Sequence, residues 1–125
     1  MNGVTLDAGA LIAFDKNDRR LVVALCVALE AKLPMTVPAG VVGQVWRDGA
    51  RQARLARLLA AKSVVVEPLD DACARAAGQL CGVTGTKDVI DAAVVLGARA
   101  RNDRIFTSDV SDLRRLDRTV VLERV

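Results

Sequence analysis

Four aspartates occupy positions at which carboxylates converge in proteins built from alternating strands and helices. Asp7 directly follows the apolar run Val4–Leu6, Asp109 follows a second apolar run, and Asp88 opens an apolar helical segment after a glycine-rich loop. Asp91 lies three residues after Asp88, one turn along the same helix face. Because crowded carboxylates repel one another unless a cation neutralises them, this set predicts a Mg²⁺ or Mn²⁺ site.

The absence of histidine narrows the chemistry further. With 0 His in the chain, catalytic triads built on imidazole and His-ligated zinc sites are excluded. A divalent cation held by carboxylates lowers the pKa of a water that attacks phosphorus, so phosphodiester hydrolysis needs no imidazole. We therefore expect an enzyme that works through carboxylates and a metal ion.

Each aspartate also has a simpler interpretation. An aspartate at a helix start is a common N-cap, and Asp88 and Asp109 both fit that role. Asp7 is harder to explain as a cap alone, because a carboxylate after a buried strand is costly to bury without a partner. Asp91 lies inside an otherwise apolar helix, where a solvated face is not expected. For Asp112, one turn after Asp109, a solvated carboxylate explains the position as well as a metal ligand does.

Apolar runs and helically spaced apolar residues alternate along the chain, which predicts a parallel sheet with helices on both faces. Strands are expected at Val4–Leu6, Met35–Val37, Ser63–Glu67, Arg104–Thr107 and Thr119–Leu122. Helices are expected at Ala8–Phe14, Asp18–Lys32, Pro38–Gly49, Arg51–Lys62, Asp71–Cys81 and Asp88–Ala100, with a short one from Ser108. In such a sheet, sites gather beyond the carboxyl ends of the strands, where Asp7 and Asp109 lie.

Composition bounds the remaining possibilities. The 125 residues suit one domain, residues 1–125, and with 52% hydrophobic but 2% aromatic residues the core must consist of Ala, Val and Leu. The 18 Lys and Arg against 15 Asp and Glu give a net charge of +3, which tolerates a polyanionic partner without requiring one.

The three cysteines indicate a reducing compartment. Cys26, Cys73 and Cys81 are an odd number without C-x-x-C spacing, and they lie in apolar helical stretches, so we interpret them as reduced core residues of a cytoplasmic protein. The N-terminus has no charged segment before a long apolar run, and no apolar stretch approaches the roughly 18 residues that span a bilayer. We expect a chain that is neither exported nor anchored.

A stripe of arginines is a weaker feature. Arg47, Arg51, Arg54 and Arg57 recur at helical steps and either bind RNA phosphates or form a solvated helix face. Trp46, on the expected apolar face, is interpreted as a core or dimer contact rather than a platform for stacked bases.

Four segments carry a family resemblance: Val4–Ala13, Val37–Ala39 with Val45–Arg47, Asp88–Ala93, and Ile105–Asp109. In this order they resemble the PIN domain in the form found in VapC toxins, across nearly the whole chain. The resemblance implies a three-layer α/β/α PIN-like domain with a central, mainly parallel sheet. It also implies a Mg²⁺- or Mn²⁺-dependent endoribonuclease that acts on an RNA substrate, forms homodimers and is inhibited by a VapB-like antitoxin. Asp7, Asp88 and Asp109 then match the first, third and fourth acidic positions of the family, with Asp91 as an additional carboxylate.

One position departs from that pattern. The second acidic position is usually Glu, and the matching residue here is Gln44, which can hydrogen-bond but adds no charge. Either Asp91 or Asp48 supplies the missing charge, or the activity is weakened or altered. We favour Asp91 as the substitute, in which case Asp91→Asn is expected to lower the affinity for Mn²⁺.

Two other functions compete with the nuclease. A chain of this kind that lacks the second acid is expected to bind RNA or its antitoxin without cutting. Mn²⁺-dependent RNA cleavage that Asp7→Asn abolishes separates the two. A small-molecule phosphatase of the aspartyl-phosphate type is disfavoured, because such enzymes place D-x-D after the first strand and Gly9 occupies the second of these positions.

Overall fold

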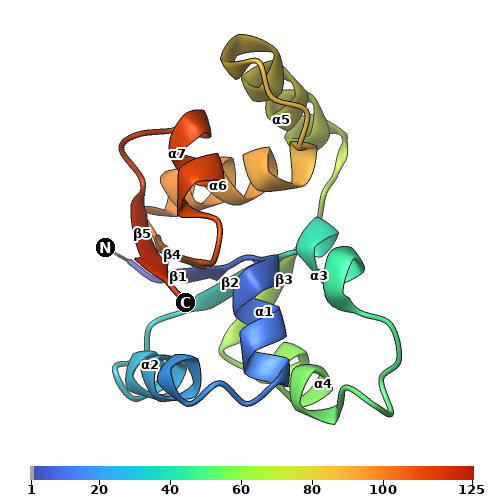
Figure 1. Ribbon diagram of the computed structural model, residues 1–125, viewed down its shortest axis with the longest axis vertical. Coiled ribbons are helices and arrows are strands. Elements are labelled where there is room, and N and C mark those ends of the chain that lie inside the picture. Colours follow the sequence, from blue (N-terminus) through green and yellow to red (C-terminus); the bar gives the residue numbers. More distant parts are fainter. Residues whose placement is uncertain (1) are drawn as a thin grey trace.

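Strands and helices alternate along the chain in the computed structural model, which describes residues 2–125 (Figure 1). The strands are β1 (Val4–Leu6), β2 (Met35–Pro38), β3 (Val64–Glu67), β4 (Arg104–Thr107) and β5 (Val121–Arg124). The helices are α1 (Ala8–Asp15), α2 (Arg19–Glu30), α3 (Ala39–Val45), α4 (Ala53–Ala60), α5 (Asp71–Thr84), α6 (Val89–Arg101) and α7 (Val110–Leu116). The expected alternation of strands and helices is confirmed.

The five strands form one sheet in the order β3-β2-β1-β4-β5, and all four pairings are parallel. In the centre of the sheet, Leu6 of β1 is paired with Phe106 of β4. Both residues are buried, as expected for central parallel strands that are covered on both faces. Because parallel strands end at the same edge, the residues that follow β1 and β4 lie side by side.

Helices cover the sheet unevenly. On one side α1 packs against β1 and β4 and α4 packs against β3, while on the other side α6 packs against β1, β2 and β4. Helix α5 packs on α6 and α7 and stands farthest from the sheet in Figure 1. The expected three-layer α/β/α domain with a mainly parallel sheet is therefore wrong: the sheet is parallel throughout, and α5 forms a further tier because its apolar stripe meets α6.

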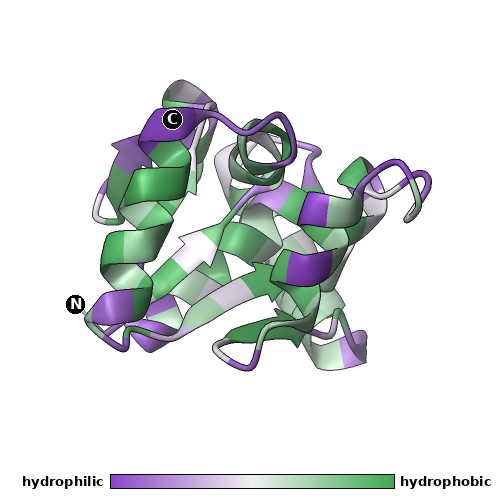
Figure 2. Cartoon of the chain, turned by 90° about the horizontal axis from the view of Figure 1, so that it is seen from below, coloured by the Kyte–Doolittle hydropathy of each residue, from purple (hydrophilic) through white to green (hydrophobic). Residues whose placement is uncertain are grey.

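Leucine, valine and alanine build the core, as the composition predicts. Leu11, Val94, Val95 and Ile105 are all 0% exposed. In Figure 2, hydrophobic colour covers most of the central strands and helices, whereas hydrophilic colour gathers at loops and helix ends. No helix among residues 2–125 is long and apolar enough to cross a membrane.

A buried polar network lies across the sheet. The Arg101 guanidinium at the end of α6 donates to Glu67 Oε2 at 2.6 Å, to Asp103 Oδ2 at 2.9 Å and to Thr5 Oγ1 at 2.9 Å. Thr5 in turn donates to Asp103 at 2.8 Å. The network satisfies the buried polar side chains of Thr5 and Asp103, and it joins the last turn of α6 to β1, β3 and the residue before β4.

Several local predictions are corrected. Helix α3 ends at Val45, not near Gly49, so Trp46 lies beyond the helix and is 37% exposed rather than buried in the core. Cys26 is exposed, because it lies one residue, or about 100° of helix rotation, from the inward-facing Leu25.

Two strand boundaries also differ from those predicted from the sequence. Pro38 closes β2, where it pairs with Glu67 of β3, and it is also the N-cap of α3, so the helix itself begins one residue later at Ala39. The last strand is shifted toward the C-terminus and begins at Val121 instead of Thr119, since Thr119 is held in a turn by Asp117.

Candidate functional site

Asp7 lies at the junction of β1 and α1, in the middle of the sheet edge. Its side chain is almost fully buried and accepts a hydrogen bond from the Ala10 backbone N–H at 3.1 Å, as an N-cap does. Burial raises the pKa of Asp7, and the negative charge of Asp109 raises it further, against hydrogen bonds from Thr107 and Ala10 that lower it. The capping interpretation is therefore correct but incomplete, because one hydrogen-bonded cap does not compensate the burial of this carboxylate.

The end of β4 brings Asp109 to the same place. The fully buried Thr107 accepts a hydrogen bond from the Asp109 backbone N–H at 2.8 Å. The same Thr107 side chain hydrogen-bonds Asp7. A buried hydroxyl thus joins the two strand ends that carry the carboxylates.

A glycine makes this approach possible. A Cβ added at Gly9 would lie 2.0 Å from Ser108 Oγ, 2.8 Å from Ser108 Cβ and 3.0 Å from the Ser108 backbone nitrogen. The first turn of α1 therefore packs directly on the loop after β4. Sequence reasoning assigned no role to Gly9, Thr107 or Ser108, although a glycine beside Asp7 and a threonine two residues before Asp109 were visible.

Helix α6 and its N-cap supply two further carboxylates. Asp88 caps the helix and accepts hydrogen bonds from the backbone N–H groups of Ile90 and Asp91 at 3.0 and 2.9 Å. Asp91 is half-buried in the first turn, and its pKa is raised to about 7. Burial is the largest cause, followed by the negative charges of Asp88, Asp7, Asp109 and Asp112. The structure thus brings together five aspartates from three parts of the chain, which we call the acidic cluster: Asp7, Asp88, Asp91, Asp109 and Asp112.

The donor chemistry of the acidic cluster suits a hard divalent cation, because Mg²⁺ and Mn²⁺ prefer carboxylate oxygens. The carboxylates of the acidic cluster are spread more widely than the ligands of a bound metal ion. Within residues 2–125, no group of three or more acidic or cysteine side chains is close enough to hold one ion together. Asp88 and Asp7 also use carboxylate oxygens to cap helices. Metal binding by Asp7, Asp88, Asp91 and Asp109 stays a prediction.

A pocket of about 340 Å³, the charged pocket, opens beside the acidic cluster. The loop between α5 and α6 forms one wall and α7 forms the other. Its lining mixes both signs of charge and consists of Gly85, Thr86, Lys87, Asp88, Asp91, Asp112, Arg115 and Leu116. Asp112 is therefore on the pocket side of α7, and its charge acts on Asp91.

Gln44 and Asp48 take different places. Gln44 is exposed on α3, one turn after Gly40, at which a Cβ would lie 3.1 Å from Ile90 of α6. Asp48 accepts a hydrogen bond from the Ala50 backbone and pairs with Arg51 at 3.8 Å, and it is not among the charges that act on Asp91. Asp91 is thus better placed than Asp48 to supply a charge to the cluster.

The arginine stripe is not one helix face. Arg47 lies beyond α3 and donates to the carbonyl oxygens of Gly43 and Trp46, whereas Arg51 precedes α4. Arg54, on α4, donates to Asn17 at 3.1 Å. Arg47 and Arg54 thus donate to different parts of the chain, and RNA binding by Arg47, Arg51 and Arg54 stays a prediction.

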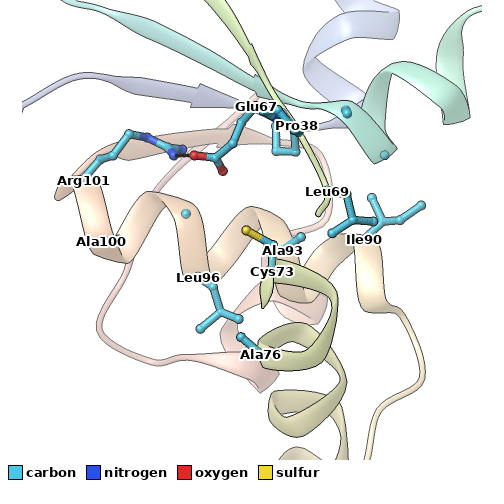
Figure 3. Close-up of a pocket in the computed structure, with 14 residues that line it drawn as sticks. Pro38, Glu67, Leu69, Cys73, Ala76, Ile90, Ala93, Leu96, Ala100 and Arg101 are labelled. Carbon is cyan, nitrogen blue, oxygen red and sulfur yellow. Dashed lines mark hydrogen bonds and ion pairs between the residues drawn. The ribbon is translucent and has the colours of Figure 1, made fainter. Parts of the chain in front are cut away.

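A second, apolar site lies on the other side of α6 (Figure 3). This apolar groove has a volume of about 230 Å³ and runs between the start of α3, the end of β3, α5 and α6. Figure 3 shows Leu69, Cys73, Ile90 and Leu96 around it, with the Arg101–Glu67 ion pair at one end. Its lining residues are Pro38, Ala39, Gly40, Glu67, Pro68, Leu69, Cys73, Ala76, Ile90, Ala93, Leu96, Gly97, Ala100 and Arg101.

Solved structures share this fold. No family model and no curated protein matches the chain. Similar structures include VapBC2 from Rickettsia felis bound to a DNA fragment from its promoter, with a TM-score of 0.70, 16% identity and 98% coverage of both chains. FitAcB from Neisseria gonorrhoeae has a TM-score of 0.64, 16% identity and 95% coverage of both chains. FitAB bound to IR36 DNA has a TM-score of 0.66, 13% identity and coverage of 97% of this chain and 94% of that one.

These findings correct the family identification. The chain shares a fold with chains of the VapBC2, FitAcB and FitAB structures, and at 16% identity or less that likeness shows the fold alone. With no family model matching, the identification as a PIN-domain toxin of the VapC family is not upheld. The four sequence segments that suggested it are short, and most of them lie where a strand ends or a helix begins, whereas Val45–Arg47 lies at the end of α3.

Proposed function

We propose that this chain is a partner-binding component of a toxin–antitoxin module, and that its apolar groove receives an apolar segment of a second protein. The observation that carries the proposal is the likeness in fold, over 98% of both chains, to a chain of the VapBC2 structure. The expected antitoxin-binding module that does not cut RNA is the closest of the sequence-based hypotheses. The expected homodimer stays a prediction.

The surface around the apolar groove supports this function. β3 is an edge strand whose Val65 and Val66 are 56% and 39% exposed, and Leu69 just beyond it is 40% exposed. An exposed apolar edge that continues into an apolar groove favours association with another chain. The charged groups at the groove end, Glu67 and Arg101, already satisfy each other, so the free part of the groove selects an apolar side chain.

Co-expression with the protein encoded in the neighbouring reading frame tests the proposal. A complex of the two purified proteins is expected. In calorimetric titration, Leu69→Glu should raise its dissociation constant at least tenfold, which is a loss of about 1.4 kcal/mol in binding free energy. The matched control is Val121→Glu, because Val121 is 49% exposed on the opposite edge strand. Absence of a complex, or equal weakening by both substitutions, would contradict the proposal.

The acidic cluster favours a second candidate function, cation-dependent hydrolysis of RNA phosphodiester bonds. The specific observation is the pKa of Asp91, raised to about 7 by burial and by four neighbouring carboxylates. Such crowding is relieved by a bound cation, although Asp7, Asp88, Asp91 and Asp109 would have to draw closer together than they lie here to share one ion. A divalent ion supplies Lewis-acid activation of the phosphate ester when bound.

A cleavage assay with Mn²⁺ tests this candidate. Asp7→Asn and Asp109→Asn are expected to lower the rate at least about a hundredfold, whereas the exposed Asp48→Asn should retain it. Titration of Mn²⁺ against Asp91→Asn measures the contribution of that carboxylate. An Asp91→Asn variant with unchanged Mn²⁺ affinity would exclude Asp91 as the substitute for the missing acid, and absence of Mn²⁺-dependent cleavage in the unaltered protein would exclude the hydrolase.

A further inference from the structure

Two cationic side chains in the charged pocket have no assigned role. Lys87 is the last residue before the cap of α6, and Arg115 lies on α7, one turn after Asp112. The two residues come from separate segments and line the same pocket of about 340 Å³. Both are exposed at its rim. The tertiary structure, not the sequence, brings these two charges together.

Within residues 2–125, neither cation is neutralised by an ion pair. Among the ion pairs formed by residues 2–125, none includes Lys87 or Arg115, although three aspartates line the same pocket. Ion pairs are formed by Arg51, Arg75, Arg99, Arg101 and Arg104, whereas other described cations such as Arg19 and Arg118 also have none, so the shared pocket is what distinguishes Lys87 and Arg115. The ammonium and guanidinium groups of the charged pocket are therefore free for an external anion.

From this arrangement we propose that Lys87 and Arg115 bind a backbone phosphate of a nucleic-acid strand beside the acidic cluster. A guanidinium group donates two parallel hydrogen bonds to a phosphate, and an ammonium group adds a mobile point charge. The neighbouring carboxylates repel an anion, so the two cations must compensate that repulsion locally. A phosphodiester strand fits an open rim better than free phosphate, because adjacent phosphates add further contacts.

The proposal deepens the second candidate function, since it names the residues that would hold the strand next to the carboxylates. It concerns binding and not cleavage. The two are separated experimentally by Ca²⁺, an oxygen-ligated cation that occupies carboxylate sites with looser geometry than Mg²⁺.

The test measures fluorescence anisotropy of a labelled single-stranded RNA, in Ca²⁺, over a series of salt concentrations. Lys87→Gln and Arg115→Gln should each weaken binding several-fold and reduce the slope of log K against log salt by about 0.7 per lost phosphate contact. Arg19→Gln is the matched control, because Arg19 begins α2, far from α7 in Figure 1, and the same charge is removed. Lys87→Arg and Arg115→Lys should keep most of the affinity.

The outcomes are decisive in either direction. Loss confined to the two pocket variants, with unchanged circular dichroism, supports the proposal, and a DNA strand of the same sequence that responds alike shows that the phosphate rather than the ribose is recognised. Equal loss in Arg19→Gln, an unchanged salt slope, or no binding by the unaltered protein would overturn it. Cleavage without dependence on Lys87 and Arg115 would leave the hydrolase intact and refute this assignment alone.

Discussion

Helix α6 serves two sites of opposite character, and their comparison shows how one helix meets two physical demands. Asp88 and Asp91 face the charged pocket, whereas Ile90, Ala93 and Leu96 face the apolar groove. Neighbouring residues on a helix point about 100° apart, so Ile90 and Asp91 reach different surroundings. On the groove side the charges are paired with one another, whereas on the pocket side the carboxylates repel one another until a proton or a cation neutralises them.

The polar atoms explain this difference. At the groove, the charge of Arg101 is matched by Glu67 and Asp103 at 2.6 and 2.9 Å. At the pocket, the charge of Asp91 meets four other carboxylates, which raise its pKa together with burial. One site is therefore prepared for an apolar partner and the other for a charged ligand.

The largest expected effect is the loss of stability when the ion pairs of Arg101, at the end of the apolar groove, are removed. Arg101→Leu leaves the nearly buried Asp103 carboxylate without its cation, and we expect a loss of about 3 kcal/mol in the free energy of unfolding. Urea denaturation measures it. Arg75→Leu is the control, because the Arg75–Asp71 pair is about 80% exposed and should contribute less than about 1 kcal/mol. Similar losses in the two variants would show that the network is not needed for stability.

A smaller loss of stability is expected from a substitution at the contact between α1 and the loop after β4, beside Asp7 and Asp109. Gly9→Ala places a Cβ against Ser108, where backbone as well as side-chain atoms must shift, and overpacking of this kind costs about 1–3 kcal/mol. Gly43→Ala in α3 meets nothing within 4 Å and should be neutral or stabilise by up to about 1 kcal/mol. Thermal unfolding of both variants checks the pair, and equal melting temperatures would contradict the tight contact between α1 and the loop after β4.

The last effect concerns pH, and solvent screening reduces it because Asp91 is only half-buried. The pKa of Asp91 is raised from 3.8 to about 7 in the folded protein, so its favourable contribution is complete below about pH 4 and is lost as the pH rises through 7. Asp91→Asn should therefore be more stable than the unaltered protein at pH 8 and closer to it at pH 5. Melting temperatures at the two pH values measure this.

Two controls accompany the pH experiment. The exposed Asp48→Asn should follow the unaltered protein at both pH values, because Asp48 lies outside the acidic cluster. Addition of Mg²⁺ at pH 8 should raise the melting temperature of the unaltered protein more than that of Asp91→Asn. An identical pH response in Asp91→Asn and the unaltered protein would mean that burial and the neighbouring carboxylates do not raise the pKa of Asp91.

Much of the fold was predictable from local patterns. Runs of apolar residues located all five strands, and the aspartate caps located the starts of helices such as α6, because both signals act over a few residues. Local patterns failed at Trp46, Cys26 and the start of β5, where helix endings and turns depend on contacts such as the hydrogen bond from the Thr119 backbone to Asp117. The extra tier made by α5 was also missed, since periodicity reports an apolar face but not what covers it.

The sequence by itself determined that Asp7 and Asp109 each follow a strand and that Asp88 begins a helix, because strand patterns and capping are short-range properties. Tertiary structure alone decided that Gly9 meets Ser108, that Asp91 has a pKa near 7, and that Lys87 and Arg115 share a pocket. Steric contact, desolvation and Coulomb interaction depend on distance through space, and only the folded chain sets those distances.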